Sequence, residues 1–151
     1  MDSGSARAVA LMSIHPRFVD RILEGTKRVE FRKTPFRLPV SHVVIYSTGP
    51  VRKVVGLFEV DSVEVDEPHK FWKKYERVSG VEKKEFDDYY DGRTQGAAIR
   101  IGKVFRLDTP LALDRAAGLS RPPQSFRYLK PRIIQRLLER VALGSAPARG
   151  S

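Results

Sequence analysis

Five charged side chains lie close together in the segment TKRVEFRK, and three of them have the types and spacing of a polar site. Lys27, Glu30 and Arg32 alternate there with the apolar residues Val29 and Phe31. Because successive side chains of a β-strand point to opposite faces, a strand here places Glu30 and Arg32 on one face, with Lys27 at its entrance. Two interpretations are open. The charges form either a solvated surface ladder or a polar site in which a carboxylate lies between two cations.

A carboxylate held between cations could recognise a nucleobase. Glu accepts hydrogen bonds from an exocyclic amino group, while Lys and Arg attract phosphate. Tyr46 and Trp72 each offer a face on which a base could stack, and each could equally be a core residue. The hypothesis is a small site for a single-stranded or flipped base, in a cleft between strand 27–33 and strand 43–47.

Further candidate binding residues come from neighbouring polar segments. The STGP segment at 47–50 predicts either an anion-binding loop or an ordinary turn. The segment RPPQSFRYL at 121–129 predicts either a border of the site or a structural segment that pins its aromatic residues into the core. These additional candidates are Lys33, Ser47, Arg52, Gln124, Ser125 and Arg127.

Hydrophobic periodicity predicts the elements that position these residues. Apolar residues at helical spacing indicate helices, and alternation indicates strands. Gly56 predicts a close backbone approach within its strand. The predicted strands are 8–14, 27–33, 42–47, 53–60 and 97–105, the last with an extension or turn over 107–113. The predicted helices are 16–25, 67–77, 81–90 and 131–143.

This order of strands and inserted helices favours an α+β fold, a small mixed β-barrel with inserted and flanking helices. The length of 151 residues and the 41% hydrophobic content suit one compact domain. We expect that domain to span residues 9–143, after an N-terminal extension at 1–8 and before a mobile tail at 144–151.

Charge is segregated along the chain, which has a net charge of +10. Residues 27–53 carry seven cations and one carboxylate, a balance of 7 − 1 = +6. Residues 59–91 carry six cations and eleven carboxylates, 6 − 11 = −5, and residues 121–140 are basic again. Two basic segments around an acidic middle are typical of a protein with a phosphate-backbone partner, although such charge can also serve solubility alone.

Several classes of function have no support in the sequence. There is no Cys, which removes thiol chemistry and disulfides and is compatible with the cytoplasm. His15, His42 and His69 are scattered, so no metal site is expected, and no phosphate-binding glycine loop or other cofactor motif is present. No targeting segment, membrane partner or membrane-spanning run is expected.

A longer motif around the charged strand resembles the ASCH domain of the PUA-like superfamily. Its residues are Ser13, Ile14, Pro16, Phe18, Ile22, Gly25, Lys27, Glu30 and Arg32. Later segments, including RPPQSFRYL, resemble a prokaryotic stand-alone ASCH subgroup over about residues 9–129. The resemblance implies a PUA-like barrel that binds RNA or a modified nucleotide in a basic cleft, without a cofactor.

The resemblance also implies two enzymatic alternatives. Related amidohydrolases that act on acylated cytidine use a Lys and a Thr; Lys27 matches the Lys, but Glu30 occupies the Thr position and cannot replace a hydroxyl nucleophile without a change of mechanism. Other ASCH proteins are ribonucleases. In a metal-independent ribonuclease, Lys27 and Glu30 would be the catalytic groups that move protons at a 2′-hydroxyl.

Overall fold

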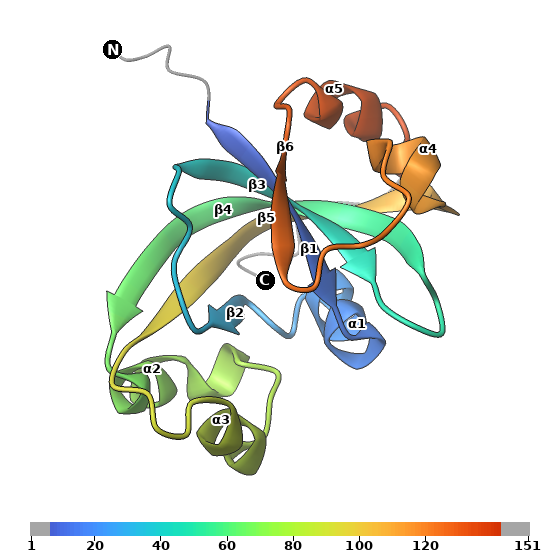
Figure 1. The fold of residues 1–151 in the computed structure, drawn as a ribbon. Helices are drawn as coiled ribbons and strands as arrows, with labels where there is room; N and C mark the ends of the chain where they lie inside the picture. The colour runs from blue at the N-terminus through green and yellow to red at the C-terminus, as the bar shows by residue number, and fades with distance from the viewer. Residues whose placement is uncertain (1–6, 143–151) are drawn as a thin grey trace.

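The computed structural model describes residues 7–142, which form six β-strands, five α-helices and one 3-10 helix (Figure 1). In chain order these are β1 (Ala8–Ile14), α1 (Pro16–Glu24), β2 (Val29–Arg32), β3 (Val40–Ser47), β4 (Lys53–Asp66), α2 (Pro68–Tyr75), η1 (Glu76–Val78), α3 (Lys83–Tyr89), β5 (Gly96–Leu111), α4 (Leu113–Ala117), β6 (Phe126–Leu129) and α5 (Ile133–Leu138). The predicted tail at 144–151 and residues 1–6 of the predicted extension lie outside the described residues. Ala8 already belongs to β1 and pairs with Val40.

The strands form one mixed sheet in the order β2-β5-β4-β3-β1-β6, which confirms the predicted α+β class. β1 and β3 are parallel, and the other neighbours are antiparallel. The close approach predicted at Gly56 is confirmed, because a Cβ there would lie 2.5 Å from the Phe105 carbonyl oxygen. β4 continues to Asp66 and β5 to Leu111, so both are longer than predicted.

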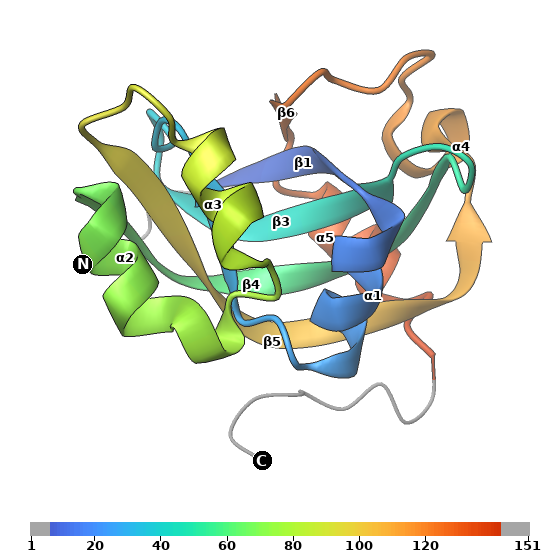
Figure 2. The ribbon, with the colours of Figure 1, turned by 90° about the horizontal axis from the view of Figure 1, so that it is seen from below.

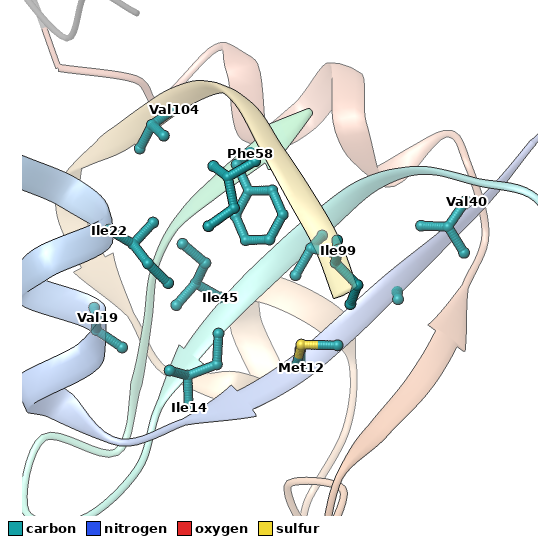
Figure 3. Close-up of a cluster of buried hydrophobic side chains, with 12 residues drawn as sticks. Met12, Ile14, Val19, Ile22, Val40, Ile45, Phe58, Ile99 and Val104 are labelled. Atoms are coloured by element: carbon teal, nitrogen blue, oxygen red, sulfur yellow. The ribbon is translucent and has the colours of Figure 1, made fainter. Parts of the chain in front are cut away.

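Helices cover both faces of the sheet (Figure 1). On one face α1 contributes Val19 and Ile22 to a buried apolar cluster, where they lie against side chains of β1, β3, β4 and β5 (Figure 3). On the other face α4 and α5 cover a second cluster. Its members alternate along β3 with those of the first cluster, Ile45 facing α1 and Tyr46 facing the other way.

A third cluster attaches the acidic middle of the chain to β2. Val29 and Phe31 of β2 pack with Phe71 and Tyr75 of α2 and Phe86 of α3. The Phe31 and Phe86 rings meet edge to face, with centroids 4.9 Å apart. The alternation predicted for this strand is therefore confirmed: its apolar side chains hold α2 and α3, and Glu30 and Arg32 are left for the opposite face.

The C-terminal helix is much shorter than the predicted 131–143. α5 spans only Ile133–Leu138, although Ile133 and Leu137 are buried as the periodicity requires. Beyond it the backbone pairs with β5 instead: Arg140 accepts from the Asp108 N–H at 2.7 Å, and Ala142 donates to the Arg106 carbonyl at 2.9 Å. This long-range pairing satisfies backbone N–H and C=O groups that would otherwise bond within a longer helix. The tertiary contact therefore overrides the local helical pattern.

The two edges of the sheet come together through side chains. β2 and β6 are the edge strands and share no backbone ladder. Arg32 at the end of β2 donates instead to the Ser13 carbonyl of β1 at 3.3 Å and to the Ser125 hydroxyl, just before β6, at 3.1 Å. We call this line of approach, between β2 on one side and β1 with residues 123–126 on the other, the seam. The candidate site lies along it.

Candidate functional site

A cavity of about 350 Å³ opens between α1, β2, α3 and the loop before β6. Its size falls in the range of pockets that hold small ligands, roughly 300–1,000 Å³. Figure 2 shows α1 and α3 on the side of the sheet where it lies. The residues that line it are Ser13, Ile14, His15, Phe18, Lys27, Glu30, Phe31, Arg32, Val81, Glu85, Phe86, Tyr89 and Gln124.

Lys27 forms the enclosed floor of this cavity. Its side chain is 2% exposed, and its ammonium donates to the Ser79 carbonyl at 2.5 Å. The same nitrogen lies 5.3 Å from the centroid of the Phe18 ring and 5.7 Å from that of Phe31. Burial lowers the pKa of Lys27 from its ordinary value, because a low-dielectric surrounding disfavours the charged form, and the Glu30 carboxylate opposes that shift.

Two glycines place the Lys27 side chain in this position. Gly25 ends α1 in the left-handed conformation, φ 91°, and turns the chain toward β2. Gly80, also left-handed at φ 67°, lies against the Lys27 stem, where an added Cβ would come within 2.9 Å of the Lys27 Cβ and Cγ. Ser79 and Gly80, which separate the two helical segments, therefore form one wall of the space that encloses the Lys27 side chain.

Glu30 lies between the two cations, as the charge pattern predicted. Its Oε2 accepts from Arg32 Nη2 at 2.8 Å and from Arg32 Nε at 3.1 Å, a two-point pair from a planar guanidinium. Its Oε1 is 3.6 Å from Lys27 Nζ, within ion-pair distance but beyond a good hydrogen bond. Oε1 is therefore the acceptor that an entering donor could reach. The solvated-ladder interpretation is wrong here, because Glu30 is only 8% exposed.

The walls of the cavity are aromatic and apolar. Phe18 of α1 and Phe86 and Tyr89 of α3 supply rings, and Tyr89 is 38% exposed. Burial of part of the Tyr89 side chain raises the pKa of its hydroxyl, so the phenol stays protonated at neutral pH. Flat apolar walls around one carboxylate acceptor suit a planar ligand that carries a hydrogen-bond donor.

An ion pair joins α1 and α3 beside the cavity. Arg17 of α1 bonds Glu85 of α3, and the Arg17 guanidinium also lies 4.3 Å from the centroid of the Phe18 ring. Glu85 closes a capping box with Glu82 at the start of α3. The hydrogen bond from Arg17 lowers the pKa of Glu85. Because both side chains are partly exposed, we expect this pair to orient the helices more than to stabilise the fold.

The loop before β6 borders the cavity and is fixed to β1. Gln124 lines the cavity, and Ser125 accepts a hydrogen bond from Arg32 through its hydroxyl. The Ser13 hydroxyl donates to the Pro123 carbonyl at 2.7 Å, and the Ser13 N–H donates to the Ser125 carbonyl at 3.0 Å. The segment 121–129 is therefore fixed to the sheet, its residues Phe126 and Tyr128 pack against the first apolar cluster, and Gln124 borders the cavity.

Four of the predicted binding residues lie away from this cavity. Tyr46 points into the cluster under α4 and α5, because it alternates with Ile45 on β3. Ser47 is buried at the end of β3, and Arg52 is exposed in the turn after it. Arg127 lies on β6, opposite Leu11. The cleft expected between strands 27–33 and 43–47 is therefore not formed.

Trp72, the second predicted stacking residue, also lies elsewhere. Its ring packs on Phe86 with centroids 5.0 Å apart and belongs to the cluster that holds α2 and α3 to β2. The aromatic walls come instead from Phe18, Phe86 and Tyr89, none of which was a predicted binding residue. A signal existed for Phe18, which belongs to the same motif as Lys27 and Glu30. For Tyr89 there was none.

The described part of the chain offers no group of three His, Asp or Glu side chains that could hold a metal ion. None of its helices is long and apolar enough to cross a membrane.

The fold and the cavity together define a small α+β protein of the PUA-like kind. The ASCH domain family model matches residues 12–100, more than half of the chain; the match includes α1, β2 and α3 and stops before the loop that precedes β6. The chain therefore belongs to the ASCH domain family, whose members are PUA-like RNA-binding domains.

Solved structures confirm the fold. The crystal structure of ASCH from Zymomonas mobilis superposes with a TM-score of 0.80 at 26% identity, over 91% of this chain and 98% of that one. The N-terminal domain of Staphylothermus marinus McrB superposes with a TM-score of 0.53 at 8% identity, over 87% and 93% of the two chains, a likeness of fold alone.

Two named relatives are similar in sequence. An ASCH domain-containing ribonuclease of Zymomonas mobilis is 27% identical over 139 residues, 87% of this chain and 91% of that protein. The large ribosomal subunit protein uL22 of Ureaplasma parvum is 36% identical over 104 residues, 69% of this chain. The chain spans only 33% of the length of that ribosomal protein.

Proposed function

We propose that this protein binds single-stranded RNA, or a nucleotide derived from it, with one base held in the cavity above Glu30. The observation that carries the proposal is the second oxygen of the Glu30 carboxylate: Arg32 holds Oε2, while Oε1 faces only the Lys27 ammonium, at 3.6 Å. Such an acceptor, at the floor of an aromatic cavity, suits the exocyclic amino group of a base. The basic segments around it suit the phosphates.

The role of Lys27 differs from that of a surface phosphate ligand. Its ammonium is enclosed and already donates to a backbone carbonyl, so it does not reach a phosphate at the mouth of the cavity. Together with Arg32 it balances the charge of Glu30, and the carboxylate can then remain ionised while nearly buried. Lys27 is thus a positioning residue for the acceptor. The contact with phosphate falls to exposed cations such as Lys33.

Retention of end-labelled single-stranded RNA on a filter, measured from 50 to 300 mM salt, tests the proposal. We expect binding that weakens steeply with salt, with a slope of about −0.7 for each phosphate contact. Single-stranded DNA of the same sequence measures the contribution of the 2′-hydroxyl. A response that stays flat across the salt range would remove the electrostatic part of the proposal, and absence of RNA binding would remove all of it.

Cleavage of RNA is the second candidate function, and the Zymomonas relative named a ribonuclease favours it. Two groups that line the cavity can move a proton: the exposed imidazole of His15 at the mouth, and the enclosed Lys27 ammonium, whose pKa burial lowers, for a ribose that enters as far as the floor. In a metal-independent reaction the 2′-hydroxyl loses its proton and attacks the phosphorus. The 5′-oxygen then leaves and takes up a proton.

Incubation of the same labelled RNA in EDTA and in Mg²⁺ separates binding from cleavage. Lys27→Met removes the ammonium and keeps the apolar stem, and His15→Ala removes the imidazole; Lys70→Ala and His69→Ala are controls on the exposed α2 segment. Cleavage that survives EDTA, disappears in Lys27→Met or His15→Ala and persists in both controls would make the protein a ribonuclease. Retention without cleavage supports the binding function alone. A cytoplasmic location, compatible with the lack of Cys, remains part of this proposal.

A further inference from the structure

A second, smaller cavity adjoins the first along the seam. Its volume is about 130 Å³, and its walls come from β1, β2, β5, β6 and the loop after β2. Arg32 and Tyr89 line both cavities. The remaining lining residues are Met12, Lys33, Thr34, Phe36, Ile99, Ser125 and Phe126.

The smaller cavity suits only part of a ligand. Pockets that hold a whole small molecule usually measure roughly 300–1,000 Å³, and this one is well below that range. Its walls are largely apolar, with the Phe36 and Phe126 rings edge to face at 5.0 Å, and Thr34 adds a polar group at the mouth. A flat ring with one polar edge matches this combination, provided that the rest of the ligand lies elsewhere.

Arg32 forms a fixed partition between the two cavities. Its three nitrogens donate to Glu30, to the Ser13 carbonyl and to the Ser125 hydroxyl, so the guanidinium is held by both sides of the seam. A ligand that occupies both cavities must therefore cross over the other shared residue. That residue is Tyr89, whose ring is held edge to face by Tyr90 at 4.9 Å.

Lys33 lies at this crossing point. Its ammonium is 5.0 Å from the centroid of the Tyr89 ring, and its side chain is exposed. Of the carboxylates in the described residues, none comes within ion-pair distance of it, in contrast to Lys74, Lys83 and Lys84, which all have such partners. A cation with three donors and no carboxylate partner among residues 7–142, between two cavities that admit rings, suits a phosphate that links two nucleosides.

We propose that the site takes a dinucleotide unit of single-stranded RNA. One base enters the larger cavity above Glu30, the linking phosphate crosses Tyr89 beside Lys33, and the neighbouring nucleoside lies at the smaller cavity. This inference rests on the proposed RNA-binding function and adds the length of the recognised unit to it. The protein thus selects linked nucleotides over free ones, because only a linked ligand occupies both cavities and the cation between them.

NMR titration with cytidine, its 3′- and 5′-monophosphates, and the dinucleotide CpC tests the inference on the full chain. We expect CpC to bind at least about tenfold more tightly than cytidine, since a stacked base contributes about 1 to 3 kcal/mol. Lys33→Ala should lower the affinity for CpC and for one of the monophosphates about tenfold and leave the affinity for cytidine unchanged. Thr34→Phe fills the smaller cavity, so we expect it to lower the affinity for CpC to the affinity measured for the monophosphate that responds to Lys33→Ala.

Both substituted residues are exposed, and Lys33→Gln provides a second variant that keeps the apolar part of the side chain. Lys70→Ala is the matched control for the loss of an exposed lysine and should change none of the affinities. Equal affinity of cytidine and CpC, or CpC binding that Thr34→Phe leaves intact, would overturn the dinucleotide unit while leaving the RNA-binding function standing. If longer single-stranded RNA also failed to bind, both proposals would fall together.

Discussion

The strands of this protein are held beside one another in two different ways. Between β4 and β5, long antiparallel strands pair through their backbones from Val54 to Asp66, interrupted by bulges. Along the seam, by contrast, β2 meets β1 and residues 123–126 only through side chains, above all through Arg32. A backbone ladder leaves no room between strands, whereas a side-chain bridge leaves cavities beside it. The proposed ligand site therefore lies where the ladder is missing.

The comparison also shows that the seam's polar groups have two roles. Glu30 fixes the guanidinium that joins the two edges, and the same carboxylate presents its second oxygen to the cavity. In the β4–β5 region backbone hydrogen bonds hold the strands together, so the pairing of these strands does not depend on a single side chain. We expect substitutions in the seam to reduce stability and binding together, and substitutions on exposed helix faces to reduce neither.

The largest expected effect is that of Glu30→Ala. It leaves the enclosed Lys27 ammonium without its counterion and frees Arg32, and breaking a buried pair by removing one partner costs about 3 kcal/mol or more. Urea denaturation measures the change in the free energy of unfolding. Asp88→Ala, which breaks the exposed pair with Lys84, should cost less than about 0.5 kcal/mol. Equal losses in the two variants would contradict the structural role of the seam.

Gly80→Ala tests how tightly the Lys27 side chain is held. The substitution places a Cβ 2.9 Å from the lysine stem and also forces alanine into the left-handed region. Gly92→Ala is the matched control, since Gly92 has φ 76° and an added Cβ would meet nothing within 4 Å. We expect about 1 kcal/mol for Gly92→Ala, from backbone strain alone, and about 2 kcal/mol for Gly80→Ala. Thermal unfolding of the two variants side by side measures the difference. Identical shifts in melting temperature would show that the Lys27 side chain moves aside without an energetic cost.

Ser125→Ala should have a smaller effect confined to the seam. It removes one hydrogen bond to the Arg32 guanidinium, worth about 1 kcal/mol, and leaves the backbone bond between Ser13 and Ser125 in place. Hydrogen exchange should speed up at the Ser13 N–H and remain unchanged at amides of the β4–β5 ladder. Faster exchange in both places would mean that the seam and the ladder unfold as one unit.

The pH dependence contributed by Lys27 should be the smallest effect at neutral pH. Burial lowers its pKa below the ordinary 10.5. Between the lowered value and 10.5 the unfolded chain binds more protons at Lys27 than the folded one, so rising pH favours the folded state, by at most about 1.4 kcal/mol per pH unit. Below that window Lys27 is protonated in both states, so the pH dependence vanishes and the unfavourable contribution of the buried charge is present in full.

Stability of the wild type relative to Lys27→Met isolates this contribution, because Tyr89 and Tyr90, whose pKa values burial raises, are common to both proteins. The difference in unfolding free energy should move in favour of the wild type as pH rises toward 10.5. A difference that moves the other way would mean that Glu30 outweighs burial and raises the pKa of Lys27.

Local patterns were sufficient for most of the fold. The strand alternation at Val29 and Phe31 and the close approach at Gly56 each follow from local residue chemistry, and the structure confirms both. The prediction of a C-terminal helix over 131–143 was too long, because the residues after α5 bond to β5, which is remote in sequence. Long-range backbone pairing leaves no signal in a helical periodicity.

The site was predictable where its residues are close in sequence. Lys27, Glu30 and Arg32 come together because they flank one short strand, and their motif also contains Phe18 and Ser13. Tyr46 was wrongly placed beside them because the face of β3 that it occupies depends on the strand's register. Tyr89 was missed because α3 reaches the cavity only through its packing on β2.

The most direct test of the account is the base preference of Glu30→Gln. Four single-stranded RNA homopolymers of equal length are titrated into wild type and variant at one salt concentration. The carboxamide keeps the shape of the side chain but replaces one of its acceptor oxygens with a donor, so we predict that preference for bases with an exocyclic amino group is lost while contacts with phosphate persist. An unchanged order of affinities among the four homopolymers would contradict the claim that Glu30 reads the base.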